Sequence, residues 1–137
     1  MTEPTPLEPT PLEPLEYTFS PLELFLFSAA GWHPHRIHFD QDYTRETEGH
    51  PDLLVHGPLQ VVHLCRYLTQ RIGGGQIRSL TSRHLAPLFV GVPAILEGVA
   101  KGSGEGRDTV RYEVWMRTRD DERRTTVCEV EISLSHA

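Results

Sequence analysis

Histidines are concentrated in one stretch of the chain, residues 31–60, which reads GWHPHRIHFDQDYTRETEGHPDLLVHGPLQ. Five of the eight histidines fall in it, and it ends in His56-Gly57-Pro58. Because the unperturbed pKa of imidazole lies close to neutral pH, such a cluster points to acid–base chemistry. We single out His38 as the candidate acid–base group. Gly57 is expected to begin a helix whose first N–H groups hold a carbonyl oxygen, with His56 near the site.

Two residues close to His38 carry charges that would support it, and each is open to two interpretations. Arg36 is either a solvated loop residue or the group that holds a substrate carboxylate or phosphate. Asp40 either caps a following helix or supplies negative charge to a protonated His38. Farther along the chain, Arg83 and His84 raise the same choice as Arg36 between a solvated and a ligand-binding role.

His33, His35 and His38 are close enough in sequence to suggest a metal site as an alternative, because zinc is commonly bound by imidazoles. Pro34 and the loop-like context argue against a regular strand that would bring the three rings together. We therefore expect no metal and no cofactor. His33 is instead expected to orient a water molecule or to pair with His38.

The composition is that of an ordinary single domain with an acidic surface. The 137 residues carry a net charge of −6 with a pI near 5.7, which argues against general nucleic-acid binding. No apolar run approaches the roughly 20 residues of a membrane span, and the acidic, proline-rich start is unlike a secretory signal. We expect a cytoplasmic protein without membrane or nucleic-acid partners, whose Cys65 and Cys128 are buried free thiols.

The first part of the chain is rich in proline and repetitive. Residues 1–16 contain Glu-Pro-Thr-Pro-Leu twice, followed by Glu-Pro-Leu-Glu. Proline at this density removes amide donors and excludes helix and sheet interiors, so we expect a disordered tail.

Residues 17–137 are expected to form one domain. Within it, the apolar run at residues 22–27 predicts a strand, and residues 40–48 predict a short helix with Asp40 or Asp42 as N-cap.

The clearest element is a helix over residues 58–72, where apolar residues recur at three- and four-residue steps. Pro58 suits its first turn, and Gly73-Gly74-Gly75 ends it. Alternation with a period of two then predicts four strands, at about 77–85, 94–101, 109–118 and 125–134. This order of elements predicts an α+β domain in which one antiparallel sheet wraps around the long apolar helix.

Three segments, in the right order, resemble the MaoC-like (R)-specific enoyl-CoA hydratases. Residues 28–43, SAAGWHPHRIHFDQDY, are similar to that family's Gly-Asp-x-Asn-Pro-(Ile/Leu)-His-x-Asp-x-x-(Tyr/Phe)-Ala. Residues 55–57, VHG, resemble its (Val/Ala)-His-Gly, and residues 85–91, LAPLFVG, resemble its Phe-x-x-Pro-Val-x-x-Gly. The form His-Arg-Ile-His-(Phe/Tyr)-Asp is closer still to type 2 hydroxyacyl-thioester dehydratases and mesaconyl- and itaconyl-CoA hydratase-like proteins.

The resemblance implies a single hot-dog domain that hydrates an enoyl thioester or dehydrates a 3-hydroxyacyl thioester. It implies that His38 is the catalytic acid–base group and that Gly57 opens the helix that holds the thioester carbonyl. The family's catalytic Asp would stand five residues before His38, where this chain has His33. The substrate-binding residues implied or suggested around them are Arg36, Asp40, His56 and Arg83.

The implied substrate is an acyl-CoA or acyl-carrier-protein thioester, and the likeness to mesaconyl-type enzymes favours a branched dicarboxylic acyl group. A single hot-dog unit leaves sheet edges exposed, so we expect a homodimer with its sites at the interface. Two alternative functions remain: a hot-dog acyl-CoA thioesterase, and a catalytically inactive acyl-thioester-binding protein. Release of free thiol would identify the first, and absence of any turnover the second.

Overall fold

The computed structural model describes residues 10–134. Its helices are α1 (Pro21–Gly31), the 3-10 helix η1 (Arg36–His38), α2 (Gln41–Glu46) and α3 (Gly57–Ile72). Its strands are β1 (Thr10–Pro11), β2 (Leu15–Tyr17), β3 (Gln76–His84), β4 (Ala94–Ser103), β5 (Thr109–Thr118) and β6 (Arg124–Ser133).

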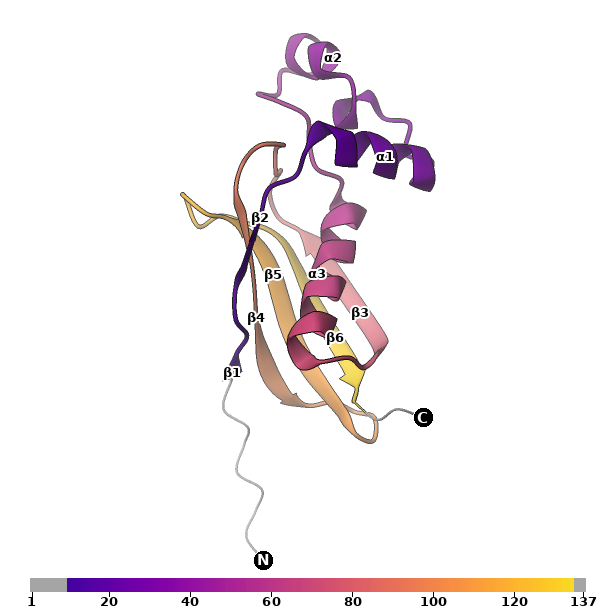
Figure 1. Ribbon diagram of the computed structural model, residues 1–137, viewed down its shortest axis with the longest axis vertical. Helices are drawn as coiled ribbons and strands as arrows, with labels where there is room; N and C mark the ends of the chain where they lie inside the picture. The colour runs from indigo at the N-terminus through magenta and orange to yellow at the C-terminus, as the bar shows by residue number, and fades with distance from the viewer. Residues whose placement is uncertain (1–9, 135–137) are drawn as a thin grey trace, which may run out of the picture.

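The strands form one antiparallel sheet in the order β1-β4-β5-β6-β3, with β2 also paired to β4. Helix α3 runs along one face of this sheet, and α1, η1 and α2 lie together beyond the N-terminal end of α3 (Figure 1). Leu64, Tyr67 and Leu68 of α3 are buried against inward-facing sheet residues such as Val114 and Met116. The predicted α+β architecture, a sheet wrapped around one central helix, is confirmed.

The central helix and the four long strands lie where the sequence pattern placed them. Helix α3 has Pro58 in its first turn and ends at Gly73, whose φ of 80° is the left-handed conformation that glycine adopts without strain. The alternation of buried and half-exposed residues along β4 and β5 is the period-two pattern seen in the sequence. These elements were predicted correctly because their periodicity matches the face that they bury.

The predicted strand at residues 22–27 is wrong, because these residues belong to α1. The Oγ of Ser20 accepts a hydrogen bond from the N–H of Glu23 at 3.2 Å, and Pro21 occupies the first turn. Leu24 is fully buried, whereas Phe25 and Leu26 are more than half exposed. A continuous apolar run does not by itself distinguish a strand from a helix, and the Ser-Pro start was the signal that distinguishes them here.

The predicted disordered tail is wrong for residues 10–16, and its first nine residues lie outside the described part of the chain. Strands β1 and β2 pair with β4 at the edge of the sheet, where the missing N–H of a proline is tolerated. The buried Tyr67 hydroxyl donates to the carbonyl of Glu13 at 2.7 Å, and Arg71 donates to the same oxygen at 2.8 Å. The domain therefore begins earlier than the change in composition suggested.

Two smaller expectations, a short helix and free cysteines, were also met. Helix α2 corresponds to the predicted helix at 40–48, and the side chain of Asp40 caps it by accepting from the N–H of Tyr43 at 3.1 Å. Both cysteines are free: Cys128 is buried, with its pKa raised to about 12 by burial, and Cys65 is half-buried. Within residues 10–134, no helix is both long and apolar enough to cross a membrane.

Candidate active site

A groove opens at the N-terminal end of α3, between the η1 segment and the end of β3. It is lined by His38, Leu54, Val55, Gly57, Pro58, Gln60, His84, Leu85, Ala86 and Pro87. The groove thus brings together residues from three segments that are distant in sequence. It contains His38 and Gly57, the two residues to which the sequence assigned the central chemistry.

The ring of His38 is held in one tautomer by the backbone. Its Nδ1 lies 2.7 Å from the carbonyl oxygen of Leu54, which can only accept a hydrogen bond, so Nδ1 carries the proton. The pKa of His38 is lowered from 6.5, mainly because partial burial disfavours the charged form, and the neighbouring His35 and His33 lower it further. The hydrogen bond to Leu54 offsets part of this effect. At neutral pH His38 is therefore a neutral imidazole whose Nε2 is free to accept a proton.

His56 is the buried neighbour that stabilises this arrangement. Its ring stacks on the ring of His38, with centroids 3.8 Å apart, and its Nε2 lies 2.7 Å from the Oγ of Ser28. Only 1% of His56 is exposed, and burial is the main reason that its pKa falls to about 4. His56 is thus a neutral, buried ring that fixes His38 from behind.

The start of α3 is left without a side-chain cap. His56 occupies the N-cap position, but its side chain bonds Ser28 on α1 and makes no capping hydrogen bond. Pro58 has no N–H, so the first turn presents the N–H of Gly57 and then that of Leu59. A helix start with uncapped N–H groups attracts the partial negative charge of an oxygen ligand.

Gly57 lies directly against the ring of His84. A Cβ built on Gly57 would lie 2.6 Å from both Cε1 and Nε2 of His84, so a side chain there would force the ring to move. The Nδ1 of His84 is 3.0 Å from the Oγ1 of Thr126. The glycine therefore allows an imidazole from β3 to lie directly against the first residue of α3.

The structure places His33 beside the groove and not among its lining residues. Its ring stacks on Phe27 at 5.4 Å and meets His56 edge-on at 5.5 Å. His56 thus lies between the rings of His33 and His38 in this row of contacts. This position does not support direct proton transfer from His33 to a substrate in the groove. His33 can still act on His38 through charge, because it lowers the pKa of His38.

Arg36 and Asp40 bind each other. They form an ion pair at 2.8 Å, and the Arg36 guanidinium lies 4.1 Å from the centre of the Tyr43 ring. The pKa of Asp40 is lowered mainly by the hydrogen bond from the N–H of Tyr43, and then by the one from Arg36. Asp40 therefore acts as the helix cap, and neither residue lines the groove. Arg83, which is exposed on β3, does not line it either, although its neighbour His84 does.

The zinc alternative finds no site in the structure. His35 uses its Nδ1 to accept from the N–H of Ile37, and His38 uses its own Nδ1 to bond Leu54. Among residues 10–134, no group of three or more histidine, cysteine or acidic residues is arranged to hold a metal ion.

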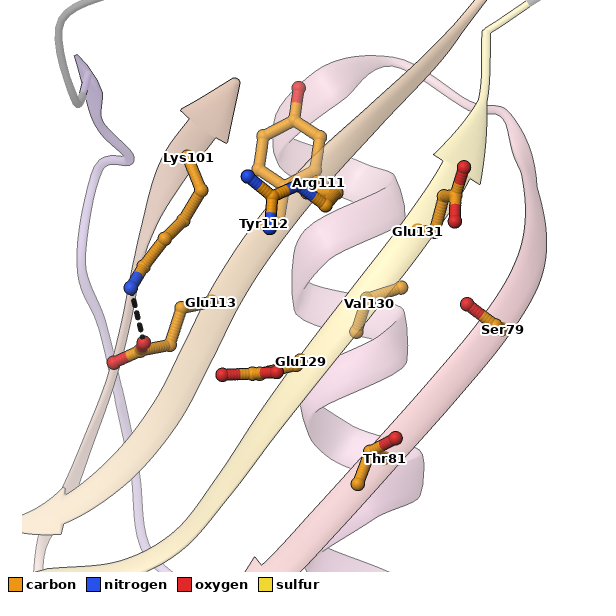
Figure 2. A pocket seen from close by; sticks show the side chains of 9 residues that line it. All are labelled: Ser79, Thr81, Lys101, Arg111, Tyr112, Glu113, Glu129, Val130 and Glu131. Atoms are coloured by element: carbon orange, nitrogen blue, oxygen red, sulfur yellow. Dashed lines mark ion pairs between the residues drawn. The ribbon is translucent and has the colours of Figure 1, made fainter. Parts of the chain in front are cut away.

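A second hollow lies on the face of the sheet turned away from α3 (Figure 2). Among its charged side chains, Lys101 pairs with Glu113 at 2.9 Å, and Glu131 accepts from the N–H of Gly106 and from the Oγ1 of Thr109. It contains no histidine, cysteine or serine–base pair. This arrangement is typical of a solvated sheet face, and the groove at Gly57 remains the candidate active site.

Sequence reasoning missed the polar network behind the groove. Gln60, which is 3% exposed, accepts hydrogen bonds through its Oε1 from the Oγ1 of Thr125 at 2.7 Å and of Thr126 at 2.8 Å. A glutamine next to apolar helix positions was the available signal, but its partners are more than 60 residues away in sequence. Ser28 was noted only as part of a motif, and its bond to His56 gives it a structural role.

Comparison with solved structures identifies the class of fold. The (R)-hydratase of A. caviae involved in PHA biosynthesis superposes with a TM-score of 0.83 at 19% identity, over 93% of this chain and 96% of that one. The 3R-hydroxyacyl-ACP dehydratase complex of Mycobacterium tuberculosis gives a TM-score of 0.77 at 15% identity, over 93% of this chain and 97% of the other. At these identities the likeness shows the fold, which is the predicted single hot-dog domain.

The sequence comparisons identify the family. The model of the hydroxyacyl-thioester dehydratase type 2 family matches residues 2–90, and the chain belongs to that family. The mesaconyl-C(4)-CoA hydratase of Chloroflexus aurantiacus is 44% identical over 72 residues, 50% of this chain and 24% of that protein. The mitochondrial hydroxyacyl-thioester dehydratase type 2 of Saccharomyces cerevisiae is 28% identical over 89 residues, 64% of this chain and 31% of that one. The chain thus spans less than a third of the length of these curated relatives.

The burial of His56 predicts a pH dependence of stability. Its folded pKa is about 4 against 6.5 in the unfolded chain, so the unfolded chain binds more protons between these values. The free energy of unfolding should be highest above pH 6.5 and fall by about 3 kcal/mol as the pH drops to 4. Urea titrations at several pH values should show this fall, and His56→Gln should remove most of it.

A matched control is His50→Gln, which removes an imidazole that does not line the groove. It should keep the acid sensitivity of the parent. An unchanged pH slope in His56→Gln would show that His56 does not remain neutral in the folded protein.

Proposed function

We propose that this protein catalyses the reversible hydration of an enoyl thioester, the reverse of dehydrating a 3-hydroxyacyl thioester. One observation carries the proposal: a neutral imidazole with its Nε2 free shares a groove with an uncapped helix start. This is the pairing of a base with an oxygen-binding site that the addition of water to an enoyl thioester requires. Membership of the hydroxyacyl-thioester dehydratase type 2 family supports the same reaction.

In this mechanism His38 activates the water. Its Nε2 removes a proton from water while the oxygen adds to the β-carbon, and the electrons of the double bond move toward the thioester oxygen. The N–H of Gly57, at the positive end of α3, stabilises the negative charge on that oxygen. His33 supports the step by lowering the pKa of His38, and His56 supports it by stacking on the His38 ring. A second proton must then reach the α-carbon.

We propose that the substrate is an acyl-CoA, with a branched dicarboxylic acyl group as the first candidate. The 44% identity to a mesaconyl-C(4)-CoA hydratase covers half of this chain and supports this choice. Arg83, exposed on β3 and adjacent in sequence to the groove-lining His84, is the cation that we propose meets a second carboxylate or a phosphate. Arg36 is less well placed, because Asp40 already engages its guanidinium. An acyl-carrier-protein thioester is the alternative carrier.

We also propose that the protein is a homodimer. Strand β3 ends the sheet and has most of its residues exposed, so its free edge can pair with another strand. Helix α1 adds exposed apolar side chains at Leu22, Phe25 and Leu26. Joining these surfaces between two copies would place each groove close to the interface.

Hydration assays with and without His38 test the function. The purified protein should hydrate at least one of crotonyl-CoA and mesaconyl-CoA, or dehydrate a 3-hydroxyacyl-CoA, as followed by the loss or gain of enoyl absorbance. His38→Gln should lower kcat by about 100- to 10,000-fold, the usual contribution of an acid–base group. His35→Gln, which alters a histidine outside the groove, should retain most of the activity.

Three results would contradict this proposal. Release of free thiol without hydration would identify a thioesterase, and full activity of His38→Gln would remove His38 from the mechanism. Binding of acyl-CoA with no turnover of any substrate in the parent protein would favour the inactive thioester-binding alternative.

Sedimentation velocity at micromolar concentration tests the proposed assembly. The expected species has twice the 15.5 kDa mass of the chain. Ser79→Pro is a sharper variant than a substitution of Leu80, because Leu80 packs against the core as well as lying on the edge strand β3. Proline at this exposed position should weaken strand pairing and shift the population toward monomer. A monomeric parent would contradict the proposal.

A further inference from the structure

The groove contains a second imidazole to which the sequence gave no role in catalysis. His84 is the last residue of β3, and its side chain reaches the first residue of α3. Among the residues that line the groove, His38 and His84 are the two histidines. The reaction proposed above needs two proton transfers, and His38 accounts for one.

A buried network fixes the orientation of the His84 ring. The hydroxyl of Thr126 donates its one proton to Oε1 of Gln60 at 2.8 Å, so it must accept from the Nδ1–H of His84. Gln60, Thr125 and Thr126 are each at most 3% exposed, and Thr125 donates to the same amide oxygen. The ring is thereby anchored to the core through Nδ1.

The opposite edge of the ring is the part that faces the site. Cε1 and Nε2 of His84 are the atoms that a side chain on Gly57 would meet. The bond from Nδ1–H to Thr126 is compatible with both the neutral and the protonated ring, so protons are gained and lost at Nε2. His84 thus resembles His38, whose Nδ1 is held by Leu54 and whose Nε2 is free.

Other groups are poorly placed to transfer the second proton. His33 packs on Phe27 and His56 and does not line the groove. Asp40 caps α2 and pairs with Arg36, and Asp52 accepts from Gln41 and pairs with Arg45. His84, on the strand side of Gly57, is the remaining candidate.

We propose that His84 is the second acid–base residue, delivering a proton to the α-carbon during hydration and removing it during dehydration. This inference rests on the proposed hydratase function. Water loses a proton to Nε2 of His38 as its oxygen bonds to the β-carbon, and the π electrons move to the thioester oxygen. When the electrons on the thioester oxygen re-form the carbonyl, a new C–H bond forms at the α-carbon with the proton from Nε2 of His84. The proton on His38 then passes to His84 through water in the groove, which leaves His38 neutral and His84 protonated again.

The test compares His84→Ala, His84→Gln and the control Ser82→Ala, an exposed residue two positions earlier on the same strand. Both His84 variants should lower kcat for hydration by about 100- to 10,000-fold with a much smaller change in KM. Gln offers an amide at the place of Nε2 but cannot carry a proton. Ser82→Ala should behave as the parent, and thermal melting should show that all three variants fold.

Added imidazole separates proton transfer from a structural role, because the exposed position of His84 leaves room for a free imidazole after truncation to alanine. Imidazole should restore part of the activity of His84→Ala, in proportion to its neutral and protonated concentrations, and should leave the parent unchanged. Either retention of activity by His84→Gln or absence of rescue in a folded His84→Ala would overturn the proposal. If the parent itself hydrates no substrate, the proposed function fails first and the role of His84 fails with it.

Discussion

The buried contact between His56 and Ser28 is the interaction on which the site depends. It joins α3, through the residue that precedes it, to α1, and the His56 side chain that makes this bond does not cap the helix start. One hydrogen bond therefore has two consequences. The α1 segment is held over the end of the central helix (Figure 1), and the first N–H groups of α3 are left for a ligand.

The same contact also bears on the charge state of the base. The buried, neutral His56 ring stacks on His38 and adds to the burial that is the main reason for its lowered pKa, so it favours the neutral form. The Leu54 carbonyl then fixes the tautomer. On the other side of Gly57, the buried Gln60 network holds His84 in a comparable way. The groove thus contains two oriented imidazoles around one helix start, and the supporting hydrogen bonds come from the backbone and the core.

Much of this architecture could be predicted from the sequence, for reasons that are visible in particular elements. Helix α3 and strands β3 to β6 bury regular faces, so the spacing of their apolar residues indicates their conformation. Helix α1 was mistaken for a strand because it is apolar on exposed as well as buried positions and so lacks a pattern. Strands β1 and β2 were missed because their proline-rich sequence disfavours sheet interiors, yet they lie at an edge. His38 and Gly57 were found through short motifs, whereas the network that orients His84 through Thr126 and Gln60 depends on contacts between distant segments, which a single sequence does not reveal.

The most direct test of the central claim is the ionisation and tautomer of His38 in solution, measured by nitrogen-15 NMR of the imidazole rings with His38→Gln for assignment. We expect Nδ1 to carry the proton and Nε2 to be unprotonated at pH 7, with a pKa below 6.5. Replacing His56 with glutamine should raise that pKa, because it removes the stacked ring that contributes to the burial of His38. A His38 that is protonated at pH 7, or one that carries its proton on Nε2, would contradict the role of a neutral base held by Leu54.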